Sequence, residues 1–421
     1  AWLQSIICRR WGSRGFWMAP VLWTAIEFIR SDGVLAFPWT VIGNSQSYYL
    51  NLIQFISFTG VFGLSFLILL INVILFFIIK NFSSRRYVVL ASLSIFLFLF
   101  IPFLYGKLTV PDPEKLQKSS SGSLRVAMIQ ANIDPTQKWD KKFKEVSFRT
   151  FEQMTYRAAS SDPDLIIWPE TATPAYLRLD IDGKLSNIRK QVDSLNTPLL
   201  TGTPDFKFIS TTDYLLFNSA FLLKPNSNKI DHYAKMQLVP FGERVPFEDV
   251  FGWLNRFDMG QADFTPGKDY KVFEIEKKGS GEGLTEITRF STLICYESTF
   301  PGIVRQFVKR GAQFLVIITN DAWFGKTSGP FQHARMAVLR AVETRRSVAR
   351  CANTGVSMLI DPYGRVMDSS KIFTEEIISG SIPIMDVKTF YVKMGDIFSW
   401  LLTIIAGFFI LVTLIYRRKT L

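Results

Sequence analysis

Three short stretches of the chain contain the side chains that acyl transfer through a thioester requires. One ends in Glu170, one begins with Lys235 and one contains Cys295, and each lies at or just beyond an apolar run. A thiol can attack an acyl carbonyl, a carboxylate can take and return the proton, and an ammonium can stabilise the oxyanion that forms. These residue types therefore predict an acyl-transfer site with a cysteine nucleophile.

Cys295 follows the apolar run 290–294, which predicts a strand that ends at the thiol. Substrate can reach a thiol at the end of a strand, and the backbone N–H groups of the turn can stabilise an oxyanion. A free cysteine is also often a small buried residue of the core. Taken alone, Cys295 leaves both interpretations open.

Glu170 follows Trp168 and Pro169 at the end of a second apolar run. Proline ends a strand and can direct the next side chain outward, where a carboxylate suits a general base. A solvated loop glutamate is the alternative. Lys235 ends a strand-like stretch ahead of a turn at Gly242. Its ammonium could stabilise an oxyanion and favour a thiolate, whereas most single lysines lie on the surface.

The two histidines of the chain, His232 and His333, allow a different mechanism. An imidazole could activate Cys295, as in papain-like enzymes. The alternative for His333 is a packed or hydrogen-bonded residue on a helix. Two isolated histidines without a second nearby thiol are a poor ligand set for a metal, so we expect no metal and no other cofactor.

The elements around these residues alternate between strands and helices. The stretch 111–122, rich in proline, lysine and serine, is predicted to be a linker. The strands expected after it are 124–129, 164–168, 198–202, 291–295, 314–319, 347–352 and 356–360, and the helices are 141–160, 185–195, 300–310 and 330–346. Buried strands that alternate with helices predict a layered α/β domain.

Membrane-spanning segments are predicted on both sides of this domain. The 421 residues are 48% hydrophobic, and the apolar runs 52–79, 88–104 and 398–416 stand out. At about 1.5 Å per residue, each can cross a hydrocarbon layer of about 30 Å. A weaker candidate, 16–29, contains Glu27. Buried helices of a soluble protein are the alternative.

The net charge of +12 is concentrated beside the apolar runs, so we expect no nucleic-acid partner. The basic clusters are Arg9, Arg10 and Arg14; Lys80, Arg85 and Arg86; and Arg417, Arg418 and Lys419. Basic residues next to membrane spans stay cytoplasmic. We therefore expect membrane helices in 1–106, an outward-facing catalytic domain in 107–396, and a membrane helix with a cytoplasmic tail in 397–421.

The chain begins with Ala1 and shows no signal-peptide pattern, so we expect further membrane helices upstream in a longer protein. Its three cysteines are Cys8, Cys295 and Cys351. On the outer side only Cys295 and Cys351 could form a disulfide. A reactive Cys295 argues against this pair, since the bond would consume the nucleophile.

The joint pattern of motifs resembles the nitrilase superfamily, whose members use a Glu–Lys–Cys triad on an α/β/β/α sandwich. The resemblance is strongest to its membrane-embedded branch, the apolipoprotein N-acyltransferases, and covers nearly the whole chain. The matching residues are Phe37, Pro38 and Trp39, Gln130, 168–172, 235–246, 294–297, 320–325, 329–335, Asn353, Gly355 and the closing span. The family has more N-terminal membrane helices than this chain shows.

By this resemblance Glu170 is the base, Lys235 the oxyanion stabiliser and Cys295 the acylated nucleophile. Four further residues match supporting or substrate-binding positions of the family: Glu243, Tyr296, Glu297 and Trp323. The implied reaction is ping-pong. A phospholipid donates an acyl group to the thiol, and the diacylglyceryl-modified N-terminal cysteine of an apolipoprotein accepts it, in the last step of lipoprotein maturation. The implied location is the bacterial inner membrane, with the catalytic domain on the periplasmic side.

Two other functions stay open, a membrane-anchored amidase that uses water as acceptor and a non-catalytic lipoprotein-binding module. One segment next to the Lys235 motif bears on substrate access. Its apolar residues, at spacings of three and four, are Phe247, Val250, Phe251, Leu254 and Phe257. The spacing predicts an amphipathic helix, either packed on the domain or dipping into the outer leaflet as an arm that guides acyl chains.

Overall fold

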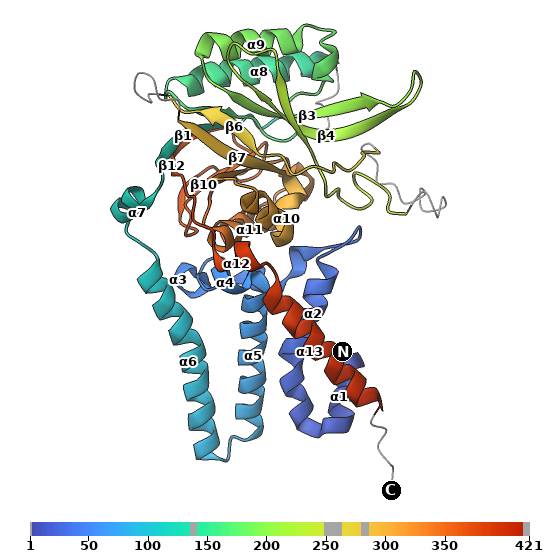
Figure 1. Ribbon diagram of the computed structural model, residues 1–421, viewed down its shortest axis with the longest axis vertical. Helices are drawn as coiled ribbons and strands as arrows, with labels where there is room; N and C mark the ends of the chain where they lie inside the picture. Colours follow the sequence, from blue (N-terminus) through green and yellow to red (C-terminus); the bar gives the residue numbers. More distant parts are fainter. Residues whose placement is uncertain (1, 135–140, 248–262, 279–285, 416–421) are drawn as a thin grey trace. The chain divides into compact units, whose positions relative to one another are not determined.

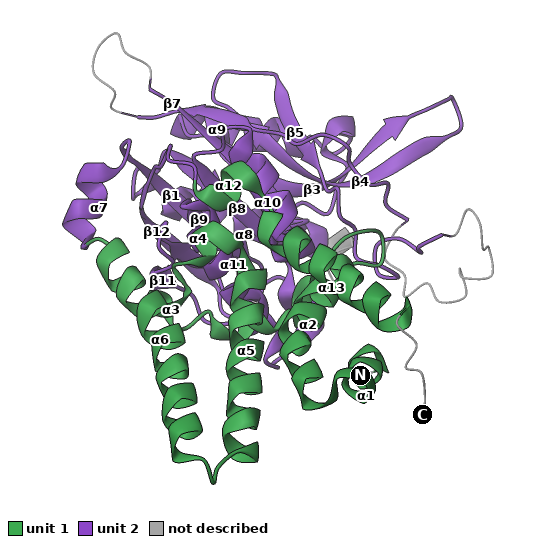
Figure 2. Ribbon diagram, turned by 60° about the horizontal axis from the view of Figure 1, so that its bottom comes forward, with its two compact units in different colours: residues 1–111, 389–421 green, residues 112–388 purple. Residues whose placement is uncertain are grey.

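The computed structural model describes residues 2–134, 141–247, 263–278 and 286–415. The chain divides into two compact units, which Figure 2 shows in green and purple. Unit 1 comprises 1–111 and 389–421, and unit 2 comprises 112–388. Unit 2 is therefore inserted between two separate parts of unit 1.

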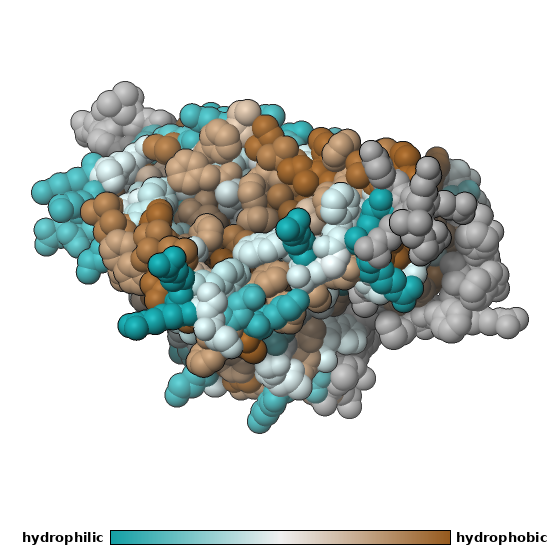
Figure 3. Space-filling view, turned by 90° about the horizontal axis from the view of Figure 1, so that it is seen from below, coloured by the Kyte–Doolittle hydropathy of each residue, from teal (hydrophilic) through white to brown (hydrophobic). Residues whose placement is uncertain are grey.

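Unit 1 contains the membrane-spanning helices. Among the described residues, three helices are long and apolar enough to cross a membrane: α5 (Val61–Lys80), α6 (Arg85–Thr109) and α13 (Ile397–Ile415). They confirm the three strong apolar runs. Many side chains that α6 leaves exposed are large and apolar, such as Phe96 and Ile101. Figure 3 shows apolar side chains at the surface among hydrophilic ones.

The first predicted span begins later than its sequence suggests. Residues 50–60 form two short helices, α3 (Leu50–Ile53) and α4 (Ile56–Thr59), and Gly60 with φ +67° separates them from α5. Only glycine adopts this left-handed backbone readily. A β-carbon at Gly60 would also lie 2.8 Å from Cε2 of Tyr391. The apolar run that is continuous in the sequence thus contains a tight turn at Gly60.

The weaker predicted span at 16–29 is not one of the three long apolar helices. The chain there forms a 3-10 helix, η1 (Gly12–Met18), and then α2 (Ala19–Arg30), whose twelve residues extend about 18 Å. This length is short of a hydrocarbon layer. Glu27 is buried in α2, and its carboxylate accepts hydrogen bonds from Trp23 Nε1 at 3.0 Å and the Ile42 backbone N at 2.9 Å.

The basic N-terminal segment of unit 1 lies beside the ends of two spans. Helix α1 (Trp2–Trp11) reaches the last turn of α13, where Trp11 Nε1 donates to Thr413 Oγ1 at 3.2 Å. The Trp17 ring stacks on Phe77, near the end of α5, with 5.2 Å between ring centroids. The first basic cluster, the C-terminal end of α5 and the C-terminal end of α13 therefore share one end of unit 1 (Figure 1).

Unit 2 contains two six-stranded sheets. The first has the order β12 (Glu376–Pro383), β1 (Ser123–Gln130), β2 (Leu165–Ile167), β3 (Leu199–Phe208), β4 (Tyr214–Leu223) and β5 (Ile230–Ala234). The second has the order β11 (Val366–Ser369), β10 (Met358–Ile360), β9 (Ser347–Ala352), β8 (Phe314–Thr319), β7 (Ile287–Ile294) and β6 (Phe273–Glu276). β1, β2 and β3 are parallel, as are β7, β8 and β9, and the other pairs are antiparallel.

The two sheets face each other between helices. Helices α8 (Lys141–Ala159) and α9 (Lys184–Leu195) cover the first sheet, and α10 (Pro301–Lys309) and α11 (Gly329–Thr344) pack on the second (Figure 1). Across the interface, Gln130 Oε1 accepts hydrogen bonds from Ser357 Oγ and Ser370 Oγ, both at 2.7 Å. The arrangement is an α/β/β/α sandwich, which confirms the predicted layered fold.

Most predicted elements of unit 2 are present. Two strands, β8 and β9, match their predictions residue for residue. Strands β4, β6, β11 and β12, which pair antiparallel, were not predicted. The predicted linker contains a short helix, α7 (Pro113–Ser119), because proline is well tolerated at the first position of a helix.

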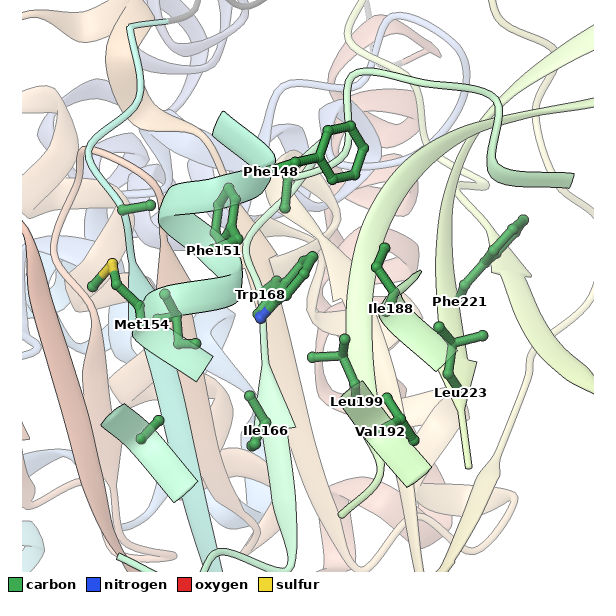
Figure 4. Packing of buried hydrophobic residues seen from close by; sticks show 14 of the residues in the cluster. Phe148, Phe151, Met154, Ile166, Trp168, Ile188, Val192, Leu199, Phe221 and Leu223 are labelled. Carbon is green, nitrogen blue, oxygen red and sulfur yellow. The ribbon is translucent and has the colours of Figure 1, made fainter. Parts of the chain in front are cut away.

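A core cluster under α8 and α9 fixes the segment that leads to Glu170. Trp168 is buried in it, stacked on Phe151 with 4.8 Å between centroids, and its Nε1 donates to Thr155 Oγ1 at 2.9 Å. Figure 4 shows Trp168 among side chains of α8, α9, β3 and β4. Burial of such a large ring, with its N–H satisfied, holds the end of β2 in one position.

Candidate active site

The candidate residues lie at the carboxyl ends of strands. Glu170 follows β2, Cys295 follows β7 directly and Lys235 follows β5 directly. Asn320 and Asp321 follow β8, the strand next to β7. Ligands of α/β sheets bind outside the carboxyl ends of parallel strands, so this edge is the expected place for a site.

Lys235 is fully buried among carboxylates. Its Nζ lies 2.8 Å from Glu243 Oε2, 2.9 Å from Glu243 Oε1 and 3.6 Å from Glu170 Oε1. Burial alone would lower the pKa of Lys235, but the charges of Glu243 and Glu170 outweigh it and raise the pKa above its usual range. The ammonium therefore stays charged.

A side-chain amide connects the two glutamates. Asn218 Nδ2 donates to Glu170 Oε1 at 2.8 Å and to Glu243 Oε1 at 2.9 Å. The backbone carbonyl oxygen of Asn218 accepts the backbone N–H of Lys235 at 2.8 Å. Glu243 also accepts the backbone N–H of Val239 on Oε2 at 2.8 Å. Asn218 and Glu243 thus fix the ammonium relative to Glu170.

Glu170 has its second oxygen bound as well. Its Oε2 accepts the backbone N–H of Asn320 at 2.9 Å, so the carboxylate contacts both sheets. The backbone behind it leaves no room, because a β-carbon at Gly202 of β3 would lie 2.6 Å from Glu170 Cα. The carboxylate is therefore held in one orientation by fixed donors.

Cys295 occupies a strained turn. Its φ of +52° lies in the left-handed region, although it is not glycine, and it begins a 3-10 helix, η6 (Cys295–Thr299). Such outliers persist where the surroundings enforce them, and they cluster at functional sites. Burial first, and the carboxylate of Glu170 next, raise the pKa of the Cys295 thiol, while Lys235 opposes the shift. The thiol is therefore neutral at rest.

Glu297 fixes the turn that contains Cys295 through hydrogen bonds of its carboxylate. Its Oε1 accepts from Tyr233 Oη at 2.6 Å and from the Met236 backbone N at 2.7 Å, and its Oε2 accepts from the Ile294 backbone N at 2.7 Å. These bonds connect the turn after β7 to the segment that contains Lys235. Burial raises the pKa of Glu297.

The two aromatic candidates lie in different surroundings. Tyr296 is buried next to Cys295, with its ring 5.0 Å from that of Phe300. Trp323 lies in a 3-10 helix, η7 (Asp321–Phe324), and 62% of it is exposed. Trp323 is therefore available to a substrate that approaches this edge of the sheet.

The contacts of the two histidines do not favour a mechanism in which an imidazole activates Cys295. His333 Nδ1 lies 2.8 Å from Asp321 Oδ1, and its Nε2 lies 3.0 Å from Ser298 Oγ and 3.2 Å from the Cys295 carbonyl oxygen. Both nitrogens are thus engaged by other partners. His232 is exposed on β5 and points away from Tyr233, since side chains alternate along a strand.

One group of described residues has the composition of a metal site. Donor atoms of Cys295, Asp321 and His333 all lie within 4.8 Å of one another. The Asp321 carboxylate, however, already binds Arg350 Nη2 at 2.8 Å as well as the imidazole. Because the Arg350 guanidinium already supplies the positive charge beside this carboxylate, the three residues do not fit a metal ligand set.

The structure thus brings the predicted catalytic candidates together with the predicted supporting residues Glu243 and Glu297, but Asn218 was missed. It is a polar residue inside the otherwise apolar strand β4, and that contrast was the available signal. The predicted amphipathic helix after Phe247 lies outside the described residues from 248 onward. Cys295 and Cys351 are free thiols, as expected from a reactive Cys295.

Comparison with known proteins identifies the family. The model of the carbon-nitrogen hydrolase family matches residues 125–391, and that of the apolipoprotein N-acyltransferase N-terminal domain matches residues 1–74. An apolipoprotein N-acyltransferase of Geobacter metallireducens is 38% identical over 407 residues, which cover 96% of this chain and 74% of that protein. The chain belongs to the apolipoprotein N-acyltransferase family.

Other members of the family show the same extent of similarity. An apolipoprotein N-acyltransferase of Chlorobaculum tepidum is 34% identical over 428 residues, covering 97% of this chain and 79% of that protein. Among solved structures, Saccharomyces cerevisiae Nit3, a member of branch 10 of the nitrilase superfamily, is similar with a TM-score of 0.46 and 18% identity. That match covers 63% of this chain and 91% of Nit3. The sandwich and the family model together assign a nitrilase-like domain to unit 2.

Proposed function

We propose that this chain is a membrane-bound acyltransferase that N-acylates the diacylglyceryl-modified N-terminal cysteine of apolipoproteins. Family membership supports the reaction. The observation that carries the residue roles is the buried Lys235 ammonium, held by Glu243 and Glu170 at the strand edge where Cys295 begins its turn. In this proposal Cys295 is the nucleophile, Glu170 the general base and Lys235 the oxyanion stabiliser.

The first half-reaction forms a thioester. The Cys295 sulfur attacks the ester carbonyl of a phospholipid while Glu170 takes the thiol proton, and the oxyanion forms beside the Lys235 ammonium. The ester C–O bond then breaks, and Glu170 returns the proton to the leaving alkoxide. A lysophospholipid leaves and the acyl group stays on sulfur.

The second half-reaction makes the amide. The free α-amine of the lipid-modified cysteine attacks the thioester carbonyl, and Glu170 takes a proton from the nitrogen. The C–S bond then breaks, and the proton returns to the Cys295 sulfur. Because the base has fixed donors on both oxygens, it can serve in both steps without moving.

The distribution of charge supports an outward-facing active site. The first basic cluster lies beside the C-terminal ends of α5 and α13, and the second flanks the short connection between α5 and α6. We propose that this end of unit 1 is cytoplasmic and that residues 107–396 form a catalytic domain on the periplasmic side of a bacterial inner membrane. Residues 1–106 and 397–421 would supply the membrane helices.

Intact-protein mass spectrometry tests the proposal. Purified protein is incubated with phospholipid vesicles, and wild type is compared with Cys295→Ala. Cys351→Ala is the matched control, because the buried Cys351 thiol contacts the Ile129 and Ile167 carbonyl oxygens at 3.4 Å between the sheets. We expect a hydroxylamine-labile fatty-acyl mass on wild type and Cys351→Ala, absent from Cys295→Ala.

The acceptor is tested with the same adduct. A diacylated lipopeptide should discharge the thioester and gain the acyl group on its amine. Discharge by water alone would favour the membrane-anchored amidase instead. Absence of any adduct from folded wild-type protein would contradict the assignment of Cys295 as the acylated nucleophile.

A further inference from the structure

The backbone of Cys295 is held in its left-handed conformation by polar groups outside the Glu–Lys–Cys set. Its carbonyl oxygen accepts a hydrogen bond from Ser298 Oγ at 2.8 Å and lies 3.2 Å from His333 Nε2. His333 Nε2 also lies 3.0 Å from Ser298 Oγ. The nucleophile's carbonyl thus accepts from Ser298 and lies against the imidazole, which also contacts the Ser298 hydroxyl, so the orientation of the turn depends on both side chains.

The imidazole is fixed in turn by a buried carboxylate. Asp321 Oδ1 lies 2.8 Å from His333 Nδ1 and accepts from Thr319 Oγ1 at 3.0 Å, while Oδ2 binds Arg350 Nη2 at 2.8 Å. Neither Asp321 nor Arg350 has any exposed surface. A β-carbon at Gly355 would lie 2.2 Å from Asp321 Oδ2, so the carboxylate packs directly against the backbone of the turn after β9. Hydrogen bonds of this kind in a dry interior orient their acceptors strongly.

The segment that contains Asp321 also contacts the general base. The backbone N–H of Asn320 donates to Glu170 Oε2 at 2.9 Å. Thr319, the last residue of β8, donates from its hydroxyl to Asp321 Oδ1. The two residues that follow β8 therefore bind the general base and, through His333, reach the turn that contains the nucleophile.

We infer that Asp321 and His333 are positioning residues that set the Cys295 sulfur at the distance from Glu170 required for proton transfer. The inference rests on the proposed function of Glu170 and Cys295. The Asp321–His333 pair, at the end of β8 and on α11, acts on the Cys295 turn from the second sheet, whereas Glu170 belongs to the first. Neither residue needs to touch the substrate for this role.

Asp321→Asn tests the carboxylate, because it keeps the size of the side chain but removes its charge. We expect the single-turnover rate of thioester formation from phospholipid to fall by about 10-fold to 100-fold, since small displacements of reacting groups cost rates of this order. The KM for phospholipid should stay unchanged. A merely structural role would lower the amount of folded protein and leave the rate of the folded fraction unchanged.

Asp361→Asn is the matched control. Asp361 is likewise a buried aspartate paired with an arginine, Arg365. It follows β10 next to Ile360, which pairs with Val348 at the end of β9 away from the site. The same substitution there should lower the melting temperature without lowering the acylation rate of the folded protein.

Two variants of His333 separate hydrogen bonding from packing. The amide of His333→Gln can still donate toward Ser298 and the Cys295 carbonyl, whereas His333→Leu fills similar space without a polar group. We expect His333→Gln to retain most of the acylation rate and His333→Leu to lose as much as Asp321→Asn. Equal rates in both His333 variants and wild type would overturn the inference.

A second acyl donor distinguishes this inference from the proposed function. A p-nitrophenyl fatty ester reports acylation of Cys295 by release of p-nitrophenolate, without a phospholipid. If wild type is acylated by this ester alone, and Asp321→Asn is slower with it, the positioning role stands and the phospholipid donor is wrong. If Asp321→Asn matches wild type with both donors, the positioning role is wrong and the proposed function stands.

Discussion

At the scale of single residues, the site depends on a cation with no solvent to stabilise it. Lys235 Nζ contacts Glu243 at 2.8 Å and Glu170 at 3.6 Å, and the side chain is completely buried. Removing one partner from such a group leaves uncompensated charge in the interior, which is more costly than removing the whole group. Stability and catalysis therefore respond differently to single and double substitutions here.

Lys235→Met should abolish thioester formation and lower the free energy of unfolding by about 3–5 kcal/mol, because Glu243 is left buried without its cation. Adding Glu243→Gln to Lys235→Met should restore part of this stability and none of the activity. Chemical denaturation and mass spectrometry of the acyl adduct measure the two effects. An active Lys235→Met variant would exclude the ammonium as the oxyanion stabiliser.

The thiol should titrate at a higher pH than an ordinary cysteine, since burial and the Glu170 carboxylate both raise the pKa of Cys295. Glu170→Gln removes a negative charge, so the pKa of Cys295 should fall and its alkylation by iodoacetamide should begin at lower pH. The same variant should form the thioester at least about 100-fold more slowly, because the base is lost. Peptide-resolved mass spectrometry over a pH series measures the first effect, and a profile unchanged by Glu170→Gln would contradict it.

The sequence predicts the reactive residues and some of the groups that hold them, Glu243 and Glu297 among them. Glu170, Cys295 and Lys235 could be predicted from the joint pattern of motifs and its resemblance to a family, whereas each residue alone left a non-catalytic interpretation open. Asn218 could not be predicted, since it acts on Glu170 from a strand 48 positions later in the chain whose pairing the local pattern does not reveal. Contacts of this kind depend on tertiary structure.

At the scale of elements, β3 acts as a rigid support behind the base. Gly202 of β3 lies so close to the segment after β2 that an added β-carbon would meet Pro169 O and Glu170 Cα, each at 2.6 Å. Backbone atoms cannot yield as a flexible side chain does. The absence of a side chain on β3 therefore sets where Glu170 lies.

Gly202→Ala should displace Glu170 and lower the acylation rate by about 10-fold or more, with a loss of stability of about 1–3 kcal/mol. Gly380→Ala in β12 is the control, because its β-carbon would meet only the end of a side chain, Leu359 Cδ1 at 2.7 Å. We expect Gly380→Ala to keep the wild-type rate of adduct formation. Wild-type kinetics in Gly202→Ala would mean that Glu170 tolerates displacement.

Helices and strands differ in how well they could be predicted. The parallel strands β8 and β9 are buried throughout and mostly apolar, so their bounds follow from composition. The turn at Gly60 before α5 could not be predicted from the apolar run, because hydropathy carries no information on the sign of φ. Similarly, the composition of α2 does not show that its regular α-helix is only twelve residues long.

At the scale of the whole molecule, the orientation across the membrane can be tested with single cysteines. In a background lacking Cys8, Cys295 and Cys351, a thiol is placed at Ser84 between α5 and α6, or at Ser210 between β3 and β4, both exposed. A membrane-impermeant maleimide should label Ser210→Cys in spheroplasts, and Ser84→Cys only after permeabilisation. The reverse pattern would place the catalytic domain in the cytoplasm.

The insertion of unit 2 into unit 1 has a consequence for biosynthesis. Ala406 of α13 packs with Ile7, Leu22 and Ala25, so an apolar cluster of unit 1 joins residues from both ends of the chain. A ribosome makes the entire catalytic domain before this partner emerges. A chain that terminates early would carry every proposed catalytic residue, yet leave the apolar faces of α1 and α2 without α13. The apolar cluster of unit 1 can therefore form only after the last helix has been made.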